Sequence, residues 1–352
     1  MKEIDITKPV AVTGGTGYLA SWIIKYLLDR GMTVRTSVRG LSDKSKHDHL
    51  LKLDGAKERL TFYEADLITE GSFDKLIDEC ELVIHTASPF KVTGITDFNK
   101  DIIEPAIDGT KNILAAVNRI PSVKRVVLTS SMASINGDAA DIFNKADRVF
   151  TADDWNTTST PKHQPYSYSK TISEIEAWGI ANTQERWDLI TINPGFILGP
   201  SLTKSDDSTS IDFMITFLKG RFRLGVPDLW FGIVDVRDVA MMHVLAGLIP
   251  DTSGRYIAVG ETYSMVHIAE KLVSHYGTKY NISTRKLPKL MFSLGGPIVG
   301  FSRKFIKRNL GIPFKVDNSR SISDMGMVFR PVEATLSDQV EQIEMDGLID
   351  SK

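Results

Sequence analysis

The sequence predicts a doubly wound α/β fold, in which helices cover both faces of a parallel sheet, followed by a smaller region of mixed structure. Short apolar runs alternate with helix-like stretches from residue 9 to residue 195. A glycine-rich turn joins the first apolar run to the first helix-like stretch. The run at 125–129 ends in hydroxyl-bearing residues, which is typical of a buried strand whose end faces a ligand.

The first 38 residues have the pattern strand, helix, strand. Residues 9–12 are apolar and lead into a Thr-Gly-Gly turn, and residues 18–28 carry apolar side chains at helical spacing. Gly31 ends this helix, and residues 33–38 alternate with β-branched side chains. Two strands joined through a helix are parallel, so this unit predicts a parallel sheet.

The same alternation continues along the chain. Further strands are expected at 60–64, 82–86, 125–129 and 189–193, and further helices at 72–79, at 97–119 with a kink at Pro105, and at 165–182. Beyond residue 195 the pattern is less regular, with a helix expected at 211–218, a strand at 230–236 and a helix at 239–248. We therefore expect one domain over residues 1–195 and a second region over 196–352, of which 229–248 returns to the sheet.

The composition is that of an ordinary globular protein with 42% hydrophobic and 24% charged residues among 352. Its 42 Lys and Arg residues nearly balance 44 Asp and Glu residues, so no basic field for nucleic acid or an anionic membrane is expected. Cys80 is the only cysteine, which excludes an intrachain disulfide and a zinc site built from cysteines. Without a signal-like start or a membrane-spanning stretch, the expected location is the cytoplasm.

The glycine-rich turn has the sequence Gly-Gly-Thr-Gly-Tyr-Leu-Ala and lies between the first strand and the first helix. At that place a dinucleotide phosphate can rest on exposed helix N–H groups. Gly14 permits the tight turn, Gly17 permits close approach of the backbone to phosphate, and Ala20 is small enough for the helix to pack on the strand. The turn therefore predicts a Rossmann-type cofactor site, with contacts from Gly14, Thr16, Gly17, Tyr18 and Leu19.

The end of the second strand selects between the two nicotinamide cofactors. An acidic residue there would bind both ribose hydroxyls of NAD and repel a 2′-phosphate. This chain has Arg39 instead, with Lys44 and Lys46 close behind, and these cations suit the phosphate of NADPH. We expect NADPH, with NAD as the alternative. An ordinary role for Arg35 and Arg39 as solvated loop charges stays open.

Tyr166 and Lys170 form the candidate reacting pair. They lie four residues apart, hence on one face of the expected helix, whereas Tyr168 points away from Lys170. Hydride delivered to a carbonyl carbon leaves negative charge on the oxygen, which then needs a proton. Tyr166 is the candidate donor, and lowering its pKa from about 10 by roughly 3 units requires about 4 kcal/mol. Lys170 and a positively charged nicotinamide can supply that energy.

The hydroxyls after the strand at 125–129 are expected to face the cofactor at the same edge of the sheet. They belong to Thr129, Ser130 and Ser131. Ser131 is the candidate that polarises the carbonyl oxygen, and Ser130 is the alternative. A surface tyrosine with a solvated lysine beside a serine-rich strand end would look the same in isolation, but here all three features accompany the glycine-rich turn.

Six stretches together resemble one family. They are T-G-G-T-G-Y-L-A at 13–20, A-D-L at 65–67, H-T-A-S-P at 85–89, L-T-S-S at 128–131, Y-S-Y-S-K at 166–170 and N-P-G-F-I-L-G-P at 193–200. Over nearly its whole length the chain is similar to the extended short-chain dehydrogenase/reductase superfamily. S-V-R at 37–39, E-G-S-F-D at 70–74 and D-D-W at 153–155 resemble its branch of dihydroflavonol 4-reductases, cinnamoyl-CoA reductases and yeast-type carbonyl (methylglyoxal) reductases.

This resemblance implies an NADPH-dependent aldehyde or ketone reductase with Ser131, Tyr166 and Lys170 as catalytic residues, the last two also contacting the cofactor. His-Gln-Pro precedes Tyr166, whereas cinnamoyl-CoA reductases typically have Asn-Trp-Tyr-Cys there, which disfavours a CoA thioester substrate. The resemblance adds further cofactor contacts, namely Arg39, Lys46, Asp66, Leu67, Thr86, Ala87, Ser88, Pro194, Gly195, Phe196 and Ile197.

Substrate selectivity is expected in the irregular part of the chain. Aromatic side chains with few fixed charges favour a small or aromatic carbonyl compound over a sugar nucleotide, whose diphosphate would need paired cations. The candidate contacts are Phe90, Asn136, Phe196 and Trp230, with Phe150 and Phe231 as further candidates. Any one of these aromatic residues is equally well explained as part of the core.

Two other functions would use the same features. A nucleotide-sugar epimerase or dehydratase reuses the Tyr-Lys-Ser set with NAD retained, and a nonenzymatic redox sensor would bind a dinucleotide and signal by a change of shape. We expect neither a metal nor a nucleic-acid or membrane partner, and a monomer or homodimer that binds a small carbonyl substrate. His47 and His49 lack a third ligand, His85 suits a buried core imidazole, and the cluster Arg303–Arg308 is typical of an amphipathic surface helix.

Overall fold

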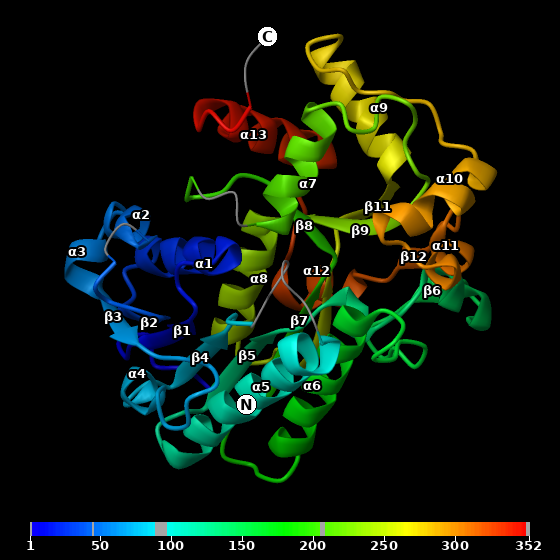
Figure 1. The fold of residues 1–352 in the computed structure, drawn as a ribbon. Coiled ribbons are helices and arrows are strands. Elements are labelled where there is room, and N and C mark those ends of the chain that lie inside the picture. Colours follow the sequence, from blue (N-terminus) through cyan, green and yellow to red (C-terminus); the bar gives the residue numbers. More distant parts are fainter. Residues whose placement is uncertain (1, 44–45, 89–96, 205–207, 350–352) are drawn as a thin grey trace.

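The structure is a computed structural model that describes residues 2–43, 46–88, 97–204 and 208–349. Within these residues the centre is a seven-stranded sheet with the order β10-β7-β5-β4-β1-β2-β3, in which neighbouring strands run parallel (Figure 1). The predicted doubly wound α/β fold is therefore confirmed. The strands are β1 (Val10–Thr13), β2 (Val34–Val38), β3 (Leu60–Glu64), β4 (Leu82–His85), β5 (Arg125–Thr129), β7 (Asp188–Pro194) and β10 (Gly254–Ala258).

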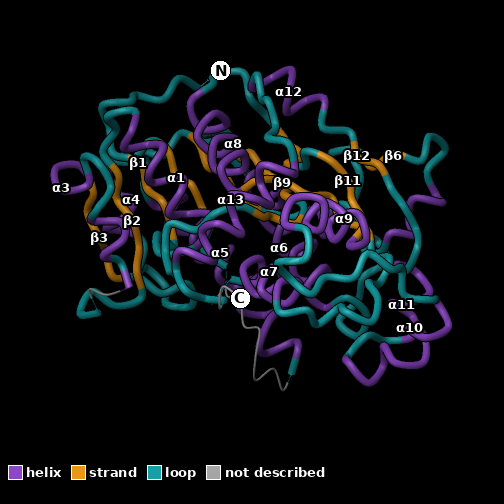
Figure 2. The backbone as a smooth tube through the Cα atoms, turned by 90° about the horizontal axis from the view of Figure 1, so that it is seen from above, coloured by secondary structure: helices purple, strands orange, loops and turns teal. Residues whose placement is uncertain are grey.

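Helices cover both faces of this sheet, as the view from above shows (Figure 2). On one face, α1 (Tyr18–Asp29) packs beside α8 (Val236–Leu248). On the other, α4 (Asp74–Ile77) and α6 (Pro165–Ala181) flank α5 (Glu104–Arg119). The crossover helices expected between the parallel strands are thus present on both sides.

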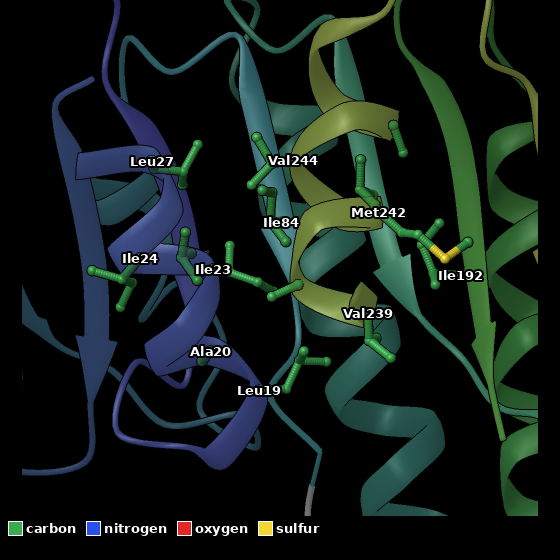
Figure 3. Packing of buried hydrophobic residues seen from close by; sticks show 14 of the residues in the cluster. Leu19, Ala20, Ile23, Ile24, Leu27, Ile84, Ile192, Val239, Met242 and Val244 are labelled. Atoms are coloured by element: carbon green, nitrogen blue, oxygen red, sulfur yellow. The ribbon is translucent and has the colours of Figure 1, made fainter. Parts of the chain in front are cut away.

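The cluster of buried apolar side chains under α1 and α8 fixes the position of the glycine-rich turn (Figure 3). Leu19, Ile23 and Leu27 recur at helical spacing on α1 and share this cluster with Ile84 of β4 and Met242 of α8. Each of the five is less than a tenth exposed. Full burial of one such side chain contributes about 1.5–3 kcal/mol, so this stripe holds α1, and the turn before it, against the strand ends.

Short elements connect the large ones. The expected helix at 97–119 with a kink at Pro105 is present as a π-helical turn, η2 (Asn99–Ile103), followed directly by α5. Pro105 is the second residue of α5, directly after the π-helical turn, and its missing N–H removes one hydrogen bond of the continuous helix at that point. The other short elements here are α2 (Asp48–Leu51), α3 (Ala56–Arg59), η3 (Met132–Ser134), η4 (Ala139–Asn144) and β6 (Val149–Phe150).

The second region is built around a smaller sheet with the order β11-β9-β8. β9 (Trp230–Asp235) runs parallel to β8 (Phe196–Leu198) and antiparallel to β11 (Glu261–Ser264). Residues 229–248 therefore divide between two layers: β9 joins the smaller sheet, and α8 covers the large one, whose edge strand is β10. The remaining elements are α7 (Thr209–Leu218), α9 (Met265–Tyr276), α10 (Lys289–Gly295), η5 (Gly296–Val299), α11 (Arg303–Asn309), β12 (Lys315–Val316), α12 (Ser319–Met325) and α13 (Val332–Met345). In the part of the chain that the structure describes, no helix combines the length and apolar content needed to cross a bilayer.

Candidate active site

The glycine-rich turn leaves the first helix open to an anion. Gly14 has a φ of 71°, and its N–H donates to Ser37 Oγ at 2.8 Å. A Cβ atom on Gly15 would lie 2.2 Å from Thr36 Oγ1, so only glycine fits against β2 at this position. Gly17 precedes α1 without a side-chain cap, so the first N–H groups of the helix keep their hydrogen-bonding capacity. An exposed helix start of this kind fits the diphosphate of a dinucleotide.

Tyr18 and Leu19 use their side chains inside the protein. The hydroxyl of Tyr18 donates to the carbonyl oxygen of Gly199 at 2.6 Å, and desolvation raises the pKa of this phenol. Trp22, one turn later, donates to the carbonyl oxygen of Pro200 at 2.9 Å. Leu19 belongs to the core. The backbone N–H groups of residues 18 and 19 are therefore the atoms available to a phosphate.

The cations within and after β2 differ in their exposure and in their partners. Arg35 donates at 2.5 Å to the backbone carbonyl that follows α4 and lies against the Tyr63 ring. Arg39 is exposed and makes no hydrogen bond or ion pair with any described residue. Lys46 is also exposed and lies 3.4 Å from the carboxylate of Asp43, whereas Lys44 lies outside the described residues. Arg39 is thus the cation that the end of β2 presents to solvent.

The segments that follow β3 and β4 differ in their hydrogen bonds: the first bonds within itself, and the second bonds to the end of β1. Asp66 is exposed, and its carboxylate accepts a hydrogen bond from the backbone of residue 68, while Leu67 is half-buried. Thr86 donates its hydroxyl to the carbonyl oxygen of Thr13 at 2.6 Å, and the N–H of Ala87 donates to Thr13 Oγ1 at 3.1 Å. The strand end that carries Ala87 is therefore bound to the end of β1.

The histidines near this edge are structural. His85 is buried, its Nδ1 lies 2.8 Å from Thr13 Oγ1, and desolvation lowers its pKa to about 3, so it is neutral at physiological pH. His47 is buried against Phe62, and His49 Nε2 lies at hydrogen-bonding distance, 3.0 Å, from Ser21 Oγ. No group of three His, Cys, Asp or Glu residues suited to a metal occurs among the described residues.

The three candidate reacting residues meet at the C-terminal ends of the strands. The hydroxyl of Tyr166 is hydrogen-bonded to the side chain of Ser131. Ser131 also begins η3, where its Oγ accepts the N–H of Ala133 at 3.1 Å. Lys170, one turn beyond Tyr166 on α6, donates to Ser88 Oγ at 3.3 Å. Ser88 and Lys170 line one recess with further residues of the strand ends, namely Ala87, Thr129 and Ser130.

The protein alone raises the pKa of the candidate proton donor. Desolvation raises the pKa of Tyr166, and the hydrogen bond with Ser131 opposes this rise. Desolvation lowers the pKa of Lys170 to about 8, and the charge of Glu174 opposes this fall. Lys170 is not among the groups that shift the pKa of Tyr166, so the structure does not show the lowering by Lys170 that the sequence predicts.

The hydroxyls around Ser131 are engaged elsewhere. Thr129 points toward α8, where its Oγ1 lies 2.7 Å from His243 Nε2, and desolvation lowers the pKa of that histidine to about 4. Ser130, on the opposite side of the chain, donates to the carboxylate of Glu174 in the interior. Of the three, Ser131 is the residue whose hydroxyl meets Tyr166. The Ser130 alternative is therefore disfavoured.

The sequence interpretation missed a buried polar network behind these residues. It is centred on Glu174 of α6 and Arg255 of β10, whose Nε lies 2.7 Å from Glu174 Oε1. Asn193 of β7 donates to the same carboxylate at 2.9 Å. A signal was available for Glu174, because it follows Lys170 by one helical turn on the same face. No comparable signal marks Arg255, which lies 81 residues further along the chain.

The candidate substrate contacts are spread over two elements and a loop. Phe196 on β8 packs edge-on against Phe213 at 4.8 Å between ring centroids and tilts against Phe231 at 5.6 Å. Trp230 lies at the start of β9 against His267, and its buried indole N–H has no partner among the described residues. Phe196, which is also an expected cofactor contact, therefore stands in an aromatic cluster.

Asn136 donates weakly, at 3.4 Å, to the carbonyl oxygen of Asp138, and is half-buried. Phe150 is 2% exposed and packs against Phe314 in the core, so it does not line a pocket. Phe90 lies outside the described residues. In the segment 194–197, Pro194 is buried, Gly195 donates its N–H to the carbonyl oxygen of residue 258 at 3.0 Å, and Ile197 is half-buried.

The remaining charged clusters also have structural roles. Arg308 of α11 donates to the buried carboxylate of Asp138 at 2.5 Å and also to the carboxylate of Asp141. Part of the basic cluster at 303–308 is therefore bound to the start of η4. Asp154 accepts the N–H of Thr151 at 2.8 Å and so closes a turn.

Comparison with known proteins gives one family. Residues 10–260 match the NAD dependent epimerase/dehydratase family. Cinnamoyl-CoA reductase CAD2 of Medicago truncatula is 33% identical over 98% of each chain, and tetraketide alpha-pyrone reductase 1 of Arabidopsis thaliana is 34% identical over 97% of this chain and 96% of that one. Gre2 of Candida albicans, crystallised in complex with NADPH, has a TM-score of 0.78 at 28% identity, covering 96% of this chain and 99% of that one.

These relatives confirm the resemblance to extended short-chain dehydrogenases/reductases and to its branch of plant and yeast reductases. Gre2 of Candida albicans shares the fold over 96% of this chain, which includes the second region. The chain belongs to the NAD dependent epimerase/dehydratase family, within which it is an NAD(P)-dependent oxidoreductase of the reductase branch.

Proposed function

We propose that the protein is an NADPH-dependent reductase that transfers a hydride to the carbonyl carbon of a small aldehyde or ketone. The observation that carries the proposal is the hydrogen bond between Tyr166 and Ser131, one helical turn from Lys170. Lys170 lines a recess together with Ala87, which follows β4 and packs against Gly14 of the glycine-rich turn. A proton donor beside a nucleotide site is what carbonyl reduction needs.

NADPH is the proposed cofactor, and it would supply the hydride. Arg39, exposed and without a partner among the described residues, would bind the 2′-phosphate, and the absence of an acidic residue at the end of β2 supports this choice. The start of α1 would bind the diphosphate through backbone N–H groups. The related Gre2 of Candida albicans was crystallised with NADPH, which supports the same choice here.

Each reacting residue has one proposed task. Ser131 donates a hydrogen bond to the substrate carbonyl oxygen and so stabilises the negative charge that develops there. Tyr166 gives its hydroxyl proton to that oxygen, which completes the alcohol. Lys170 keeps its ammonium next to the tyrosinate that remains, until solvent returns the proton. The hydride and this proton together balance the reduction of a carbonyl to an alcohol.

The proposed substrate is small and largely apolar. The aromatic cluster of Phe196, Phe213 and Phe231 offers an apolar wall, without the paired cations that a sugar diphosphate would need. A yeast relative, 25% identical, is described as a methylglyoxal/isovaleraldehyde reductase. The His-Gln-Pro sequence before Tyr166 favours such a substrate over a CoA thioester.

Consumption of NADPH tests this function. The purified protein is mixed with NADPH and, in turn, methylglyoxal, isovaleraldehyde, an aromatic aldehyde, a ketone and a cinnamoyl thioester, and the loss of NADPH absorbance is followed. We expect turnover with aldehydes or ketones and little with the thioester. Tightly held NAD with no net NADPH consumption would favour an epimerase or dehydratase, and dinucleotide binding without any turnover would favour a sensor.

Replacement of Arg39 with Ser tests the cofactor. The variant is expected to raise KM for NADPH by about 10- to 100-fold, because a charge-assisted hydrogen bond contributes about 1.5–3 kcal/mol, and to leave KM for NADH nearly unchanged. Arg35→Ser is the matched control, since its guanidinium is already bound at the other end of β2. An equal change of both KM values in Arg39→Ser would reject the phosphate contact.

A further inference from the structure

We infer that Glu174, paired with Arg255, is a positioning residue that holds the Ser131 backbone and the Lys170 ammonium in place from beneath the crevice. The inference rests on the proposed reductase function. Glu174 lies on α6 one turn beyond Lys170 and two turns beyond Tyr166, so the three side chains follow one another along one helix face. Only 1% of Glu174 is exposed, so its carboxylate cannot itself contact a substrate.

The carboxylate of Glu174 accepts hydrogen bonds from residues of β7, of η3 and of the chain just after β5. Five neutral groups donate to it: the hydroxyls of Ser130, of Ser134 at 2.5 Å and of Thr191 at 3.0 Å, the Asn193 amide at 2.9 Å and the Trp178 indole N–H at 3.3 Å. A buried carboxylate that is satisfied in this way is rigid, because each donor that is removed leaves charge without a partner.

Two of these donors connect Glu174 to Ser131. The hydroxyl of Ser134 lies 2.7 Å from the carbonyl oxygen of Ser131 as well as 2.5 Å from Glu174, and shares its one proton between them. The amide of Asn193 reaches the same carbonyl oxygen at 3.3 Å. The backbone of Ser131 is thus held by two residues that are themselves held by Glu174. Its side chain is directed toward Tyr166 from this fixed backbone.

Arg255 allows a charge to be kept at this depth. Its guanidinium bonds Glu174, stacks over the ring of Trp155 at 3.9 Å, and donates to the carbonyl oxygens of Ala152 and Asp154. Desolvation opposes ionisation of Glu174, but Arg255 and the serine hydroxyls outweigh it and lower the pKa of Glu174. The carboxylate is therefore ionised at neutral pH. An unpaired charge at this depth would cost several kcal/mol.

The negative charge also acts on Lys170. Desolvation lowers the pKa of Lys170 to about 8, and Glu174 is the group that opposes it. The other titratable groups that face Lys170 are His85 of β4, whose pKa is lowered to about 3, and Tyr166, whose pKa is raised, and both are uncharged at neutral pH. Without the charge of Glu174 the ammonium would lose its proton at a lower pH.

Glu174→Gln tests the inference, with Glu176→Gln as the matched control. Glu176 lies on the same helix but is exposed and pairs with Lys111 at 3.3 Å. In Glu174→Gln we expect kcat for carbonyl reduction to fall about 10- to 100-fold with KM for NADPH unchanged, and the alkaline limb of kcat against pH to move down by roughly one pH unit. Glu176→Gln should leave both quantities unchanged.

Two more variants separate the two parts of the inference and serve if Glu174→Gln does not fold. Ser134→Ala removes the contact with the Ser131 carbonyl but keeps the charge, so kcat should fall while the alkaline limb stays in place. Glu174→Asp keeps the charge and withdraws the carboxylate, so it should behave like Ser134→Ala. Wild-type turnover together with an unchanged kcat in the folded variants would overturn the inference and leave the proposed function intact. Absence of wild-type turnover would instead reject the proposed function.

Discussion

Tyr166→Phe is expected to lower kcat for carbonyl reduction by about 100- to 10,000-fold, the range over which a positioned general acid contributes. The substitution removes only the hydroxyl that is hydrogen-bonded to Ser131 and retains the ring. KM for NADPH should therefore stay within about twofold, because the glycine-rich turn and Arg39 are untouched. Steady-state NADPH oxidation gives kcat, and quenching of protein fluorescence by NADPH gives cofactor binding separately.

Tyr168→Phe is the matched control for this experiment. Tyr168 lies on the same helix two residues later, so it points away from Lys170, and its loss of a hydroxyl should leave kcat within about twofold. The comparison isolates the position of the phenol from any general effect on α6. If Tyr166→Phe kept more than about a tenth of wild-type kcat, the phenol would not be the proton donor.

The parts of the site that the sequence predicts are those encoded within a few residues. Gly14 and Gly17 lie between a strand and a helix that are adjacent in sequence, so their place at the helix start follows from local pattern alone. Tyr166 and Lys170 share a helix face for the same reason. The meeting of Tyr166 with Ser131 required one further step, the rule that strand ends in a parallel sheet share an edge.

The buried network depends instead on contacts that no local pattern shows. Arg255 is the second residue of β10, and a cation at that position argues against a buried strand when only the sequence is known. It is tolerated because Glu174, 81 residues earlier, neutralises it. The apolar run of β9 looked like a strand of the large sheet, but β8 and β11 pair with it. Pairing of this kind is set by tertiary structure.

The candidate aromatic side chains differ in position although they share the same chemistry. Phe150 and Phe196 have the same chemistry, yet the first packs against Phe314 in the core and the second stands beside the strand ends. Burial of a phenylalanine is favourable in either place, so residue type does not separate a core position from a pocket wall.

Lys170→Met is expected to make the protein more stable at neutral pH while lowering kcat at least about 100-fold. Burial of the ammonium lowers the pKa of Lys170 from 10.5 to about 8, which corresponds to about 3 kcal/mol when the group is fully buried. Lys170 is half-buried, so we expect a gain of about 1–3 kcal/mol in the free energy of unfolding. Met is unbranched and fills a similar space, which limits the loss of packing.

The pH dependence of this gain has a defined sign. Below pH 8 the wild-type lysine is protonated in both states, and the folded state bears the full cost of the buried charge. Between pH 8 and 10.5 the folded state has lost the proton and the unfolded state has not, so the cost falls as pH rises and is gone above 10.5. Urea unfolding of wild type and variant across this range should therefore show a difference that is largest at neutral pH and shrinks on alkaline titration.

Lys111→Met is the control for charge removal, because Lys111 is exposed on α5 and its change should stay within about 0.5 kcal/mol. If Lys170→Met were less stable than wild type at pH 7, the ammonium would be well stabilised by Ser88 and its surroundings. The expected free-energy cost of burying this charge would then be rejected. The expected result has a functional consequence. A lysine that weakens the fold where it stands fits the proposed role, in which the reaction uses its charge, because active sites commonly exchange stability for activity.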